Sequence, residues 1–242
     1  MQPSAVVSQE EWIAARRALL EKEKAHMRGG DALAAERRAL PWVKVDKTYV
    51  FETPSGAKAL AELFGDASQL IVHHLMYGAD WSAACPGCTF QAEHIDGPAP
   101  HLQRHDVRIV AVSSAPLDKL LAYKARMGWR FEWVSASGPD FNRDFRVTFT
   151  DDEIAAGRID YNFGTITTDP RYIDRELPGV SVFYRNEAGE VFHTYSTYAR
   201  GLDALLGAHH YLDLTPEGRN NAAYPNWPRR RDEYDTATAP HG

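Results

Sequence analysis

A Cys-X-X-Cys segment placed between a strand and a helix constrains this chain more than any other feature. Cys85-Pro86-Gly87-Cys88 holds both cysteines of the 242-residue sequence and follows the apolar run Leu70–Tyr77. Two thiols at this spacing can form a small disulfide that reopens by thiolate exchange, and the same sulfur atoms can also bind a metal ion. The segment therefore predicts thiol chemistry at a strand–helix junction.

From Leu70 onward, short apolar strands alternate with helices, a pattern typical of a sheet with helices packed on its faces. We expect strands at Leu70–Tyr77, Val107–Ser113 and Trp129–Ser135, and then a hairpin of Val180–Arg185 and Glu190–Tyr195. Helices are predicted from Cys85 through Cys88 to about Ile95 and over Leu117–Met127, and a final helix is predicted to start with Leu202–Leu206. This order of elements is that of the thioredoxin-like fold.

Residues 1–59 are predicted to form a helical extension and an arm. Ser8 and Glu11 have the spacing of a capping box, and Gly29-Gly30 is expected to end the first helix. A second helix is expected from Asp31 to Ala39, followed by a strand pair or extended arm over 42–52. The apolar stripe of these helices predicts packing either on the rest of the chain or on a second subunit, as in a homodimer.

The remaining residues are predicted to form one domain, 60–214, with an insertion at about 140–176, and an irregular, extended C-terminal tail, 215–242. The aromatic insertion includes Tyr161-Asn162-Phe163-Gly164, which we expect to serve in packing rather than as a lid over Cys85. The histidines and tyrosines near the C-terminus are expected to be structural; they are His193, Tyr195, Tyr198, His209, His210 and Tyr211.

Composition predicts a soluble cytoplasmic protein with a substantial core. The chain is 44% hydrophobic with a net charge of −6 at pH 7, which offers no field to attract nucleic acid. The basic run Arg229-Arg230-Arg231 precedes Asp232 and Glu233 and is expected to be solvated. Neither a signal peptide nor a stretch long enough to span a membrane is evident. In a reducing cytoplasm a permanent disulfide is disfavoured, which leaves transient redox chemistry or metal binding.

Several stretches resemble the bacterial family DUF899, whose members are identified as predicted dithiol-disulfide oxidoreductases. The resemblance extends from about Trp12 to Tyr234 and rests on four stretches: Asp80-Trp81 through Cys88, Met127-Gly128-Trp129, Tyr161-Asn162-Phe163-Gly164, and His193-Thr194-Tyr195-Ser196-Thr197-Tyr198-Ala199-Arg200-Gly201. It implies a thioredoxin-like α/β fold, with a central mixed sheet flanked by helices.

The two cysteines are predicted to have different roles. Cys85 is expected at the helix N-terminus, where unpaired amides and the helix dipole stabilise a thiolate, and Pro86 suits the first helical position. Cys88, one turn further, is expected to be shielded within reach of Cys85. We therefore predict a thiol-disulfide oxidoreductase without a cofactor, in which Cys85 attacks a disulfide or thiol of a protein or small molecule and Cys88 resolves the mixed disulfide.

Three residues are predicted to bind the substrate. Pro178 precedes a strand at the position of the cis-proline that faces the dithiol in thioredoxin-like folds, and Leu177 precedes it. A cis bond at Pro178 is the expectation. Trp81 resembles the tryptophan found before the dithiol in thioredoxins, although Ser82-Ala83-Ala84 intervene here.

A metal-binding protein that uses the same thiols is the alternative. Cys85, Cys88, His101 and His105 have the spacing C-x2-C-x12-H-x3-H of a zinc finger, but Gly97-Pro98-Ala99-Pro100 interrupts the helix that a finger requires. A zinc or copper site could instead combine the thiolates with His94, or with His73 or His74. Because the last two are adjacent in a strand, at most one can face the dithiol.

Peroxide reduction is a further alternative. The strand order, with an insertion before the proline, also resembles that of peroxiredoxins, in which one thiolate attacks peroxide. Their pattern places Pro and Thr shortly before the attacking cysteine, whereas Asp80-Trp81-Ser82-Ala83-Ala84 precedes Cys85 here.

Overall fold

The computed structural model describes residues 4–136, 138, 140–169, 174–219 and 228–234. The chain divides after Trp42 into two compact units. No helix in these described ranges is both long and apolar enough to cross a membrane.

The first unit consists of one long helix, α1 (Gln9–Arg38). Its capping box is formed as predicted, since the Glu11 amide donates to Ser8 Oγ at 3.2 Å and the Ser8 amide donates to Glu11 Oε2 at 2.9 Å. The prediction of two helices was wrong, because α1 continues through Gly29-Gly30. A glycine inside a helix costs only about 1 kcal/mol relative to alanine, so a pair of them need not end it. The packing partner of α1 stays a prediction.

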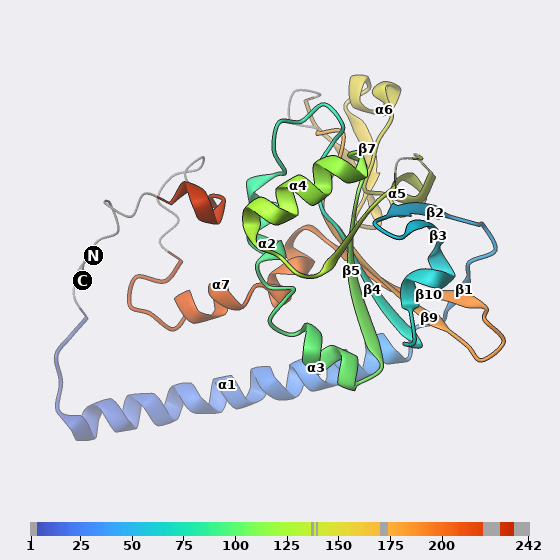
Figure 1. The fold of residues 1–242 in the computed structure, drawn as a ribbon. Helices are drawn as coiled ribbons and strands as arrows, with labels where there is room; N and C mark the ends of the chain where they lie inside the picture. Colours follow the sequence, from blue (N-terminus) through green and yellow to red (C-terminus); the bar gives the residue numbers. More distant parts are fainter. Residues whose placement is uncertain (1–3, 137, 139, 170–173, 220–227, 235–242) are drawn as a thin grey trace. The chain divides into compact units, whose positions relative to one another are not determined.

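The second unit is built on a mixed sheet of eight described strands (Figure 1) in the order β1-β10-β9-β4-β5-β6-β2-β3. Their bounds are β1 Val43–Lys44, β2 Val50–Thr53, β3 Gly56–Ala59, β4 Gln69–His74, β5 Val107–Ser113, β6 Glu132–Ser135, β9 Gly179–Arg185 and β10 Val191–Tyr198. β4, β5 and β6 are parallel, and β9 is antiparallel to β4. The arm after residue 42 joins this sheet, since β1 pairs with β10 and β2 pairs with β6.

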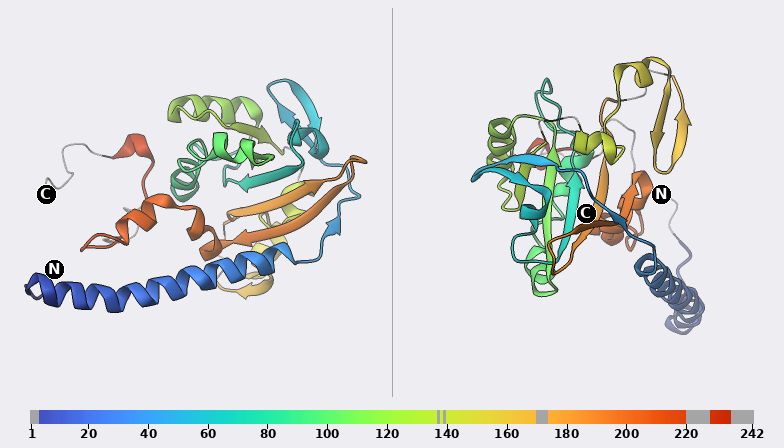
Figure 2. Two further views of the ribbon diagram at one scale, coloured as in Figure 1. Left: turned by 90° about the horizontal axis from the view of Figure 1, so that it is seen from below. Right: turned by 90° about the vertical axis from the view of Figure 1, so that its right-hand side faces the viewer.

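The helices of this unit are short, apart from α4. Their bounds are α2 Pro86–Ala92, α3 Ala99–Arg104, α4 Leu117–Met127, α5 Asp140–Asp144, α6 Asp151–Ala155 and α7 Gly207–Leu212, with 3-10 helices at Leu60–Phe64, Ala199–Leu205 and Arg231–Glu233. Figure 2 shows α2 and α4 over one face of the sheet and α5 on the other. Where a helix was expected at 202–206, the structure has the second half of a 3-10 helix, and α7 follows it.

Alternation along the strands separates two apolar cores. In β4 and β5, Leu70, Val72, Val110 and Val112 pack with Phe141 and Phe183 on the α5 face, whereas Ala111 packs on the opposite face. That second core includes Cys88, Leu120, Tyr123 and Trp133. Period-two alternation with both faces covered is what a central strand pair of a layered α/β protein requires. The predicted thioredoxin-like fold is confirmed.

The segment expected as an insertion forms α5, α6 and a separate hairpin, β7 (Arg158–Tyr161) with β8 (Gly164–Thr167). It has a small core of its own, made of Val147, Phe149, Ile159, Tyr161 and Tyr198, with Ile154 and Leu177 packed against it. Its aromatic side chains Phe149 and Tyr161 are thus buried, in agreement with the expected packing role. Phe163, in contrast, is 79% exposed.

Candidate functional site

Cys85 is the N-cap residue of α2, and Pro86 occupies the first turn, as the sequence predicted. The backbone of Cys85 is held on both sides: its amide donates to Met76 O at 3.1 Å and its carbonyl accepts from the Thr89 amide at 2.9 Å. Proline suits this place because its missing N–H has no partner to lose at a helix start. The half-buried Cys85 side chain lines a pocket.

The surroundings of Cys85 favour its thiolate. The pKa of Cys85 is lowered to about 6, and the largest cause is a hydrogen bond from the Cys88 side chain. Burial acts in the opposite direction, and hydrogen bonds from the amides of Cys88 and Gly87 lower the pKa further. A thiol with this pKa is mostly ionised at pH 7, and thiolate is the form that attacks a disulfide. Cys85 therefore combines access with reactivity.

Cys88 has the opposite surroundings. Its side chain is 2% exposed, and its sulfur accepts a hydrogen bond from the Met76 amide at 3.3 Å. The hydrogen bond to Cys85 and burial together raise the pKa of Cys88 well above the ordinary value. Both cysteines are unbridged thiols in this structure. Cys88 is thus a protonated thiol beside the Cys85 thiolate.

A buried carboxyl group, that of Glu176, lies close enough to Cys88 for its charge to help raise the pKa of that thiol. Glu176 is 6% exposed and accepts hydrogen bonds from the Tyr77 amide at 2.9 Å and from the Ser114 hydroxyl. Consecutive amides, those of Met76 and Tyr77, therefore bind the Cys88 sulfur and the Glu176 carboxyl group. Burial raises the pKa of Glu176, against the lowering effect of its two donors. A buried carboxyl group with a raised pKa is a stronger proton acceptor than an exposed one.

The pocket beside Cys85 has a volume of about 310 Å³. It is lined by Cys85, Gly87, Cys88, Gln91, Pro178, Ala199, Arg200, Leu202, Asp203, Leu206, His209, Arg219 and Pro228. Of the three predicted substrate-binding residues, Pro178 lines this pocket. Trp81 packs instead against the core around Cys88, and Leu177 packs against the core of the insertion.

One hydroxyl group ties the insertion to the pocket wall. Tyr161 Oη donates to Pro178 O at 2.6 Å and accepts from the Ala199 amide at 3.1 Å. Pro178 and Ala199 both line the pocket, so the buried tyrosine fixes two parts of its wall relative to each other. The insertion thus holds Pro178 and Ala199 of the pocket wall in place through Tyr161.

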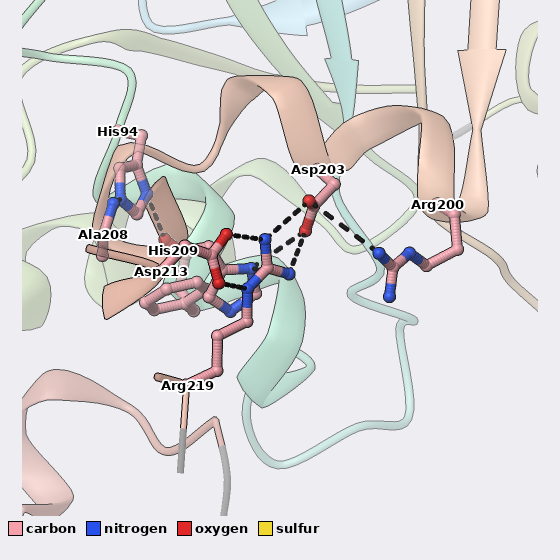
Figure 3. A network of polar contacts seen from close by, with 8 residues as sticks. His94, Arg200, Asp203, Ala208, His209, Asp213 and Arg219 are labelled. Atoms are coloured by element: carbon pink, nitrogen blue, oxygen red, sulfur yellow. Dashed lines mark hydrogen bonds and ion pairs between the residues drawn. The ribbon is translucent and has the colours of Figure 1, made fainter. Parts of the chain in front are cut away.

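Charged side chains of the C-terminal segment also line the pocket, and Figure 3 shows the polar contacts that join them. Arg219 makes paired contacts to Asp203 at 2.9 and 3.0 Å and to Asp213 at 2.7 and 2.6 Å, and His209 Nδ1 lies 3.0 Å from Asp203 Oδ1. Hydrogen bonds from Arg219 lower the pKa of Asp203 to about 2. Arg200, whose side chain is 88% exposed, approaches Asp203 Oδ2 only to 4.0 Å.

The structure does not bring the residues of the metal alternative together. Within the described ranges, no three His, Cys, Asp or Glu side chains are grouped closely enough to bind a metal ion. His101 lies on α3 and His105 at its end. His94 uses both ring nitrogens, since Nδ1 donates to Phe90 O at 2.9 Å and Nε2 accepts from the Ala208 amide at 3.1 Å.

The two adjacent histidines of β4 face opposite sides of the sheet, as strand alternation predicts. His73 accepts a hydrogen bond from Gln91 of α2 at 2.9 Å, and burial lowers its pKa to about 4. His74 is bonded to Ser181 at 2.9 Å and stacks on Phe141 on the α5 face, and burial lowers its pKa to about 3. Both rings are therefore neutral core groups at pH 7.

Sequence reasoning missed four residues of this site: Glu176, Arg200, Asp203 and Arg219. It also expected a purely structural His209. The signal for Arg200 was present, because the stretch His193 to Gly201 carries the family resemblance. No spacing rule indicated Glu176 or Arg219, since both reach the site only through the folding of distant segments.

These features define a thioredoxin-like protein with a Cys-X-X-Cys pair at the start of α2. A family model described as "Bacterial protein of unknown function (DUF899)" matches residues 1–234, and the chain therefore belongs to DUF899. No curated protein matches it.

Solved structures with a similar fold include peroxiredoxins. Peroxiredoxin Q of Xanthomonas campestris is 16% identical, with 67% of this chain and 90% of that chain covered at a TM-score of 0.44. For peroxidoxin BcpB of Mycobacterium tuberculosis the identity is 15%, the coverage 70% and 92%, and the TM-score 0.47. The mitochondrial 2-Cys peroxiredoxin of Plasmodium falciparum is also 15% identical, with coverage of 69% and 91% and a TM-score of 0.38. At this distance the likeness concerns only the fold.

Proposed function

We propose that this protein is a thiol-disulfide oxidoreductase in which Cys85 is the nucleophile and Cys88 the resolving thiol. The observation that carries the proposal is the contrast between the two sulfur atoms. Cys85 lines a pocket and has a pKa lowered to about 6, whereas the pKa of the buried Cys88 is raised. One reactive and one protected thiol in contact are what a two-step exchange requires.

In the first step the Cys85 thiolate attacks one sulfur of a substrate disulfide. A mixed disulfide forms between Cys85 and the substrate, the substrate S–S bond breaks, and the departing thiolate takes up a proton. In the second step Cys88 loses its proton and attacks Cys85 Sγ, which releases the second substrate thiol. The substrate gains two electrons, the Cys85–Cys88 disulfide forms, and a dithiol reductant returns the protein to its starting state.

The second step needs a proton acceptor, because the pKa of Cys88 is raised. Glu176 fits this role because its carboxyl group is buried. The carboxyl group accepts a hydrogen bond from the Tyr77 amide, and Cys88 Sγ accepts one from the preceding amide, that of Met76. Ser114 and the Tyr77 amide hold the carboxyl group in place. In the reverse direction the same group returns the proton to Cys88.

The test is trapping of the mixed disulfide. Purified Cys88→Ser protein is incubated with oxidised glutathione, quenched with acid and analysed by mass spectrometry. A glutathione adduct on Cys85 is expected to accumulate in this variant, whereas wild-type protein passes on to the intramolecular disulfide. The matched Cys85→Ser variant should acquire no adduct, since Cys88 is 2% exposed.

Equal labelling of the two variants would contradict the role assignment. A second measurement addresses the chemistry itself, by equilibrating wild-type protein in glutathione buffers and counting free thiols by alkylation. Reversible loss of two thiols per chain is expected. A protein that keeps both thiols at every ratio of reduced to oxidised glutathione is not an oxidoreductase of this kind.

A further inference from the structure

We propose that the pocket beside Cys85 binds a low-molecular-weight disulfide that carries a carboxylate, and that Arg200 binds this carboxylate. The inference rests on the proposed function and specifies its substrate class. It concerns the stretch ending in Ala199-Arg200-Gly201, to which sequence analysis gave no chemical role.

The pocket has the size and lining of a small-molecule site. Its volume of about 310 Å³ lies at the lower end of the range for ligand pockets, roughly 300 to 1,000 Å³. Pro178, Leu202, Leu206 and Pro228 contribute apolar surface to the pocket that Cys85 also lines. A disulfide with short aliphatic arms matches this surface, because its reacting sulfur atoms and methylene groups are apolar.

Arg200 and Arg219, the two lining arginines, differ in what they can offer a ligand. Arg219 is fully engaged, with paired hydrogen bonds to both Asp203 and Asp213. The Arg200 side chain is 88% exposed and approaches Asp203 only to 4.0 Å. Because the Asp203 carboxylate already accepts paired hydrogen bonds from Arg219 and Arg200 stays 4.0 Å away from it, the Arg200 guanidinium can bind a ligand carboxylate through two parallel hydrogen bonds.

The backbone that carries Arg200 is held in an uncommon conformation. Ala199 has a φ of 47°, in the left-handed region that residues with a Cβ rarely adopt. Its amide donates to Tyr161 Oη, which in turn donates to Pro178 O. A Cβ added at Gly201 would collide with Thr197 Oγ1, so another residue at this position would force the threonine side chain to shift. Strain of this kind persists where the surrounding structure enforces it, commonly at ligand sites.

The charge distribution indicates how the ligand lies. Asp174 is close enough to raise the pKa of Cys85 by its charge, and a ligand carboxylate on that side would be repelled. Elsewhere in the pocket lining, Arg219 is shared by the carboxylates of Asp203 and Asp213, and Arg200 is a lining cation whose guanidinium is not held in such a paired contact within the described residues. The ligand therefore places its disulfide against Cys85 and its carboxylate at Arg200.

The test compares three small disulfides of similar length: dithiodipropionate, its neutral diamide and the dication cystamine. The rate constant for oxidation of the reduced full-length protein is measured with each by quenched alkylation and mass spectrometry. Wild type is expected to prefer the dicarboxylate to the diamide. In Arg200→Glu the rate with the dicarboxylate should fall about tenfold, as expected for loss of a charge-assisted contact, while the rate with the diamide changes less than about twofold.

Two control variants accompany this comparison. Arg200→Lys should retain part of the preference, since it keeps the charge but not the paired geometry. Arg130→Glu changes the net charge equally at an exposed residue outside the pocket lining and should leave all three rates unchanged. The diamide has no carboxylate, so its rate constant reports only the reactivity of Cys85. A change of that reactivity in Arg200→Glu would therefore appear in the diamide rate and can be distinguished from a loss of carboxylate binding.

Equal wild-type rates with the dicarboxylate and the diamide would overturn the inference, as would a parallel loss on both in Arg200→Glu. A protein disulfide that reacts far faster than all three probes, and is insensitive to Arg200, would also overturn it. These outcomes leave the proposed function intact. That function fails separately if none of the disulfides oxidises the Cys85–Cys88 pair in the wild type.

Discussion

Cys85 and Cys88 are one helical turn apart, yet their surroundings give them opposite chemistry. Cys85 caps α2 and lines an open pocket, and its pKa is lowered to about 6. Cys88 is enclosed by the core and its pKa is raised. Two identical side chains therefore differ in reactivity because of burial and hydrogen bonding, and the pKa of each thiol depends on the other thiol.

The strongest test of this asymmetry removes each thiol in turn. Cys85→Ser should reduce the rate of small-disulfide reduction to background, because the remaining thiol is buried and protonated at pH 7. Cys88→Ser should retain a fast first step and lose only the second. Stopped-flow release of the substrate thiol measures the first step in both variants, and a fast phase in Cys85→Ser would contradict the assignment.

The next largest effect is expected from Glu176→Gln. Removal of the buried proton acceptor should slow formation of the Cys85–Cys88 disulfide about tenfold to a hundredfold at pH 7. The attack by Cys85 should be unaffected, so the two steps separate by quenched-flow alkylation. Ser114→Ala, which keeps the carboxyl group but removes one of its donors, is the matched control and should show a smaller change. An unchanged second step in Glu176→Gln would exclude this residue from proton transfer.

The dependence of Cys85 on Cys88 can be read from a pH profile. In wild type the rate of Cys85 alkylation should titrate with a midpoint near pH 6 and fall below it as the thiolate is protonated. Cys88→Ala removes the largest contribution to this lowered pKa, so the midpoint should rise towards 9.0 and the rate at pH 7 should fall about tenfold. Cys88→Ser keeps a hydroxyl donor and should lie between the two. Identical profiles for all three proteins would show that the hydrogen bond does not tune Cys85.

The smallest effect is expected at Gly87, between the two thiols. A Cβ at this position would lie 3.8 Å from Cys85 Sγ and 3.9 Å from Pro228 Cγ, which are ordinary contacts. Gly87→Ala should therefore raise the free energy of unfolding by about 0.5 kcal/mol through the lower flexibility of the unfolded chain, with the Cys85 midpoint unchanged. Chemical denaturation measures the first quantity and the alkylation profile the second. Gly87→Pro, which lacks the amide that helps lower the pKa of Cys85, should raise that midpoint.

Local patterns predicted much of the fold. The strand Val107–Ser113 and the helix Leu117–Met127 have the predicted bounds, and the hairpin after Pro178 is present. These elements have strong periodicity and clear end signals, such as Gly128 at the end of α4. The expected break at Gly29-Gly30 failed because glycine weakens a helix without ending it, and pairing of the arm with β6 and β10 depends on contacts far apart in sequence.

By itself the sequence determined the strands and helices from β4 to β6, the hairpin after Pro178, the placement of Cys85 at a helix start and the protected position of Cys88 one turn later. These properties follow from spacing and backbone preferences that act over a few residues. Only the tertiary structure decided that the charge of Glu176 acts on Cys88 and that Arg200, Asp203 and Arg219 line the pocket of Cys85. The physical reason is that charge and burial act through space, so their effect on a thiol depends on segments a hundred residues away.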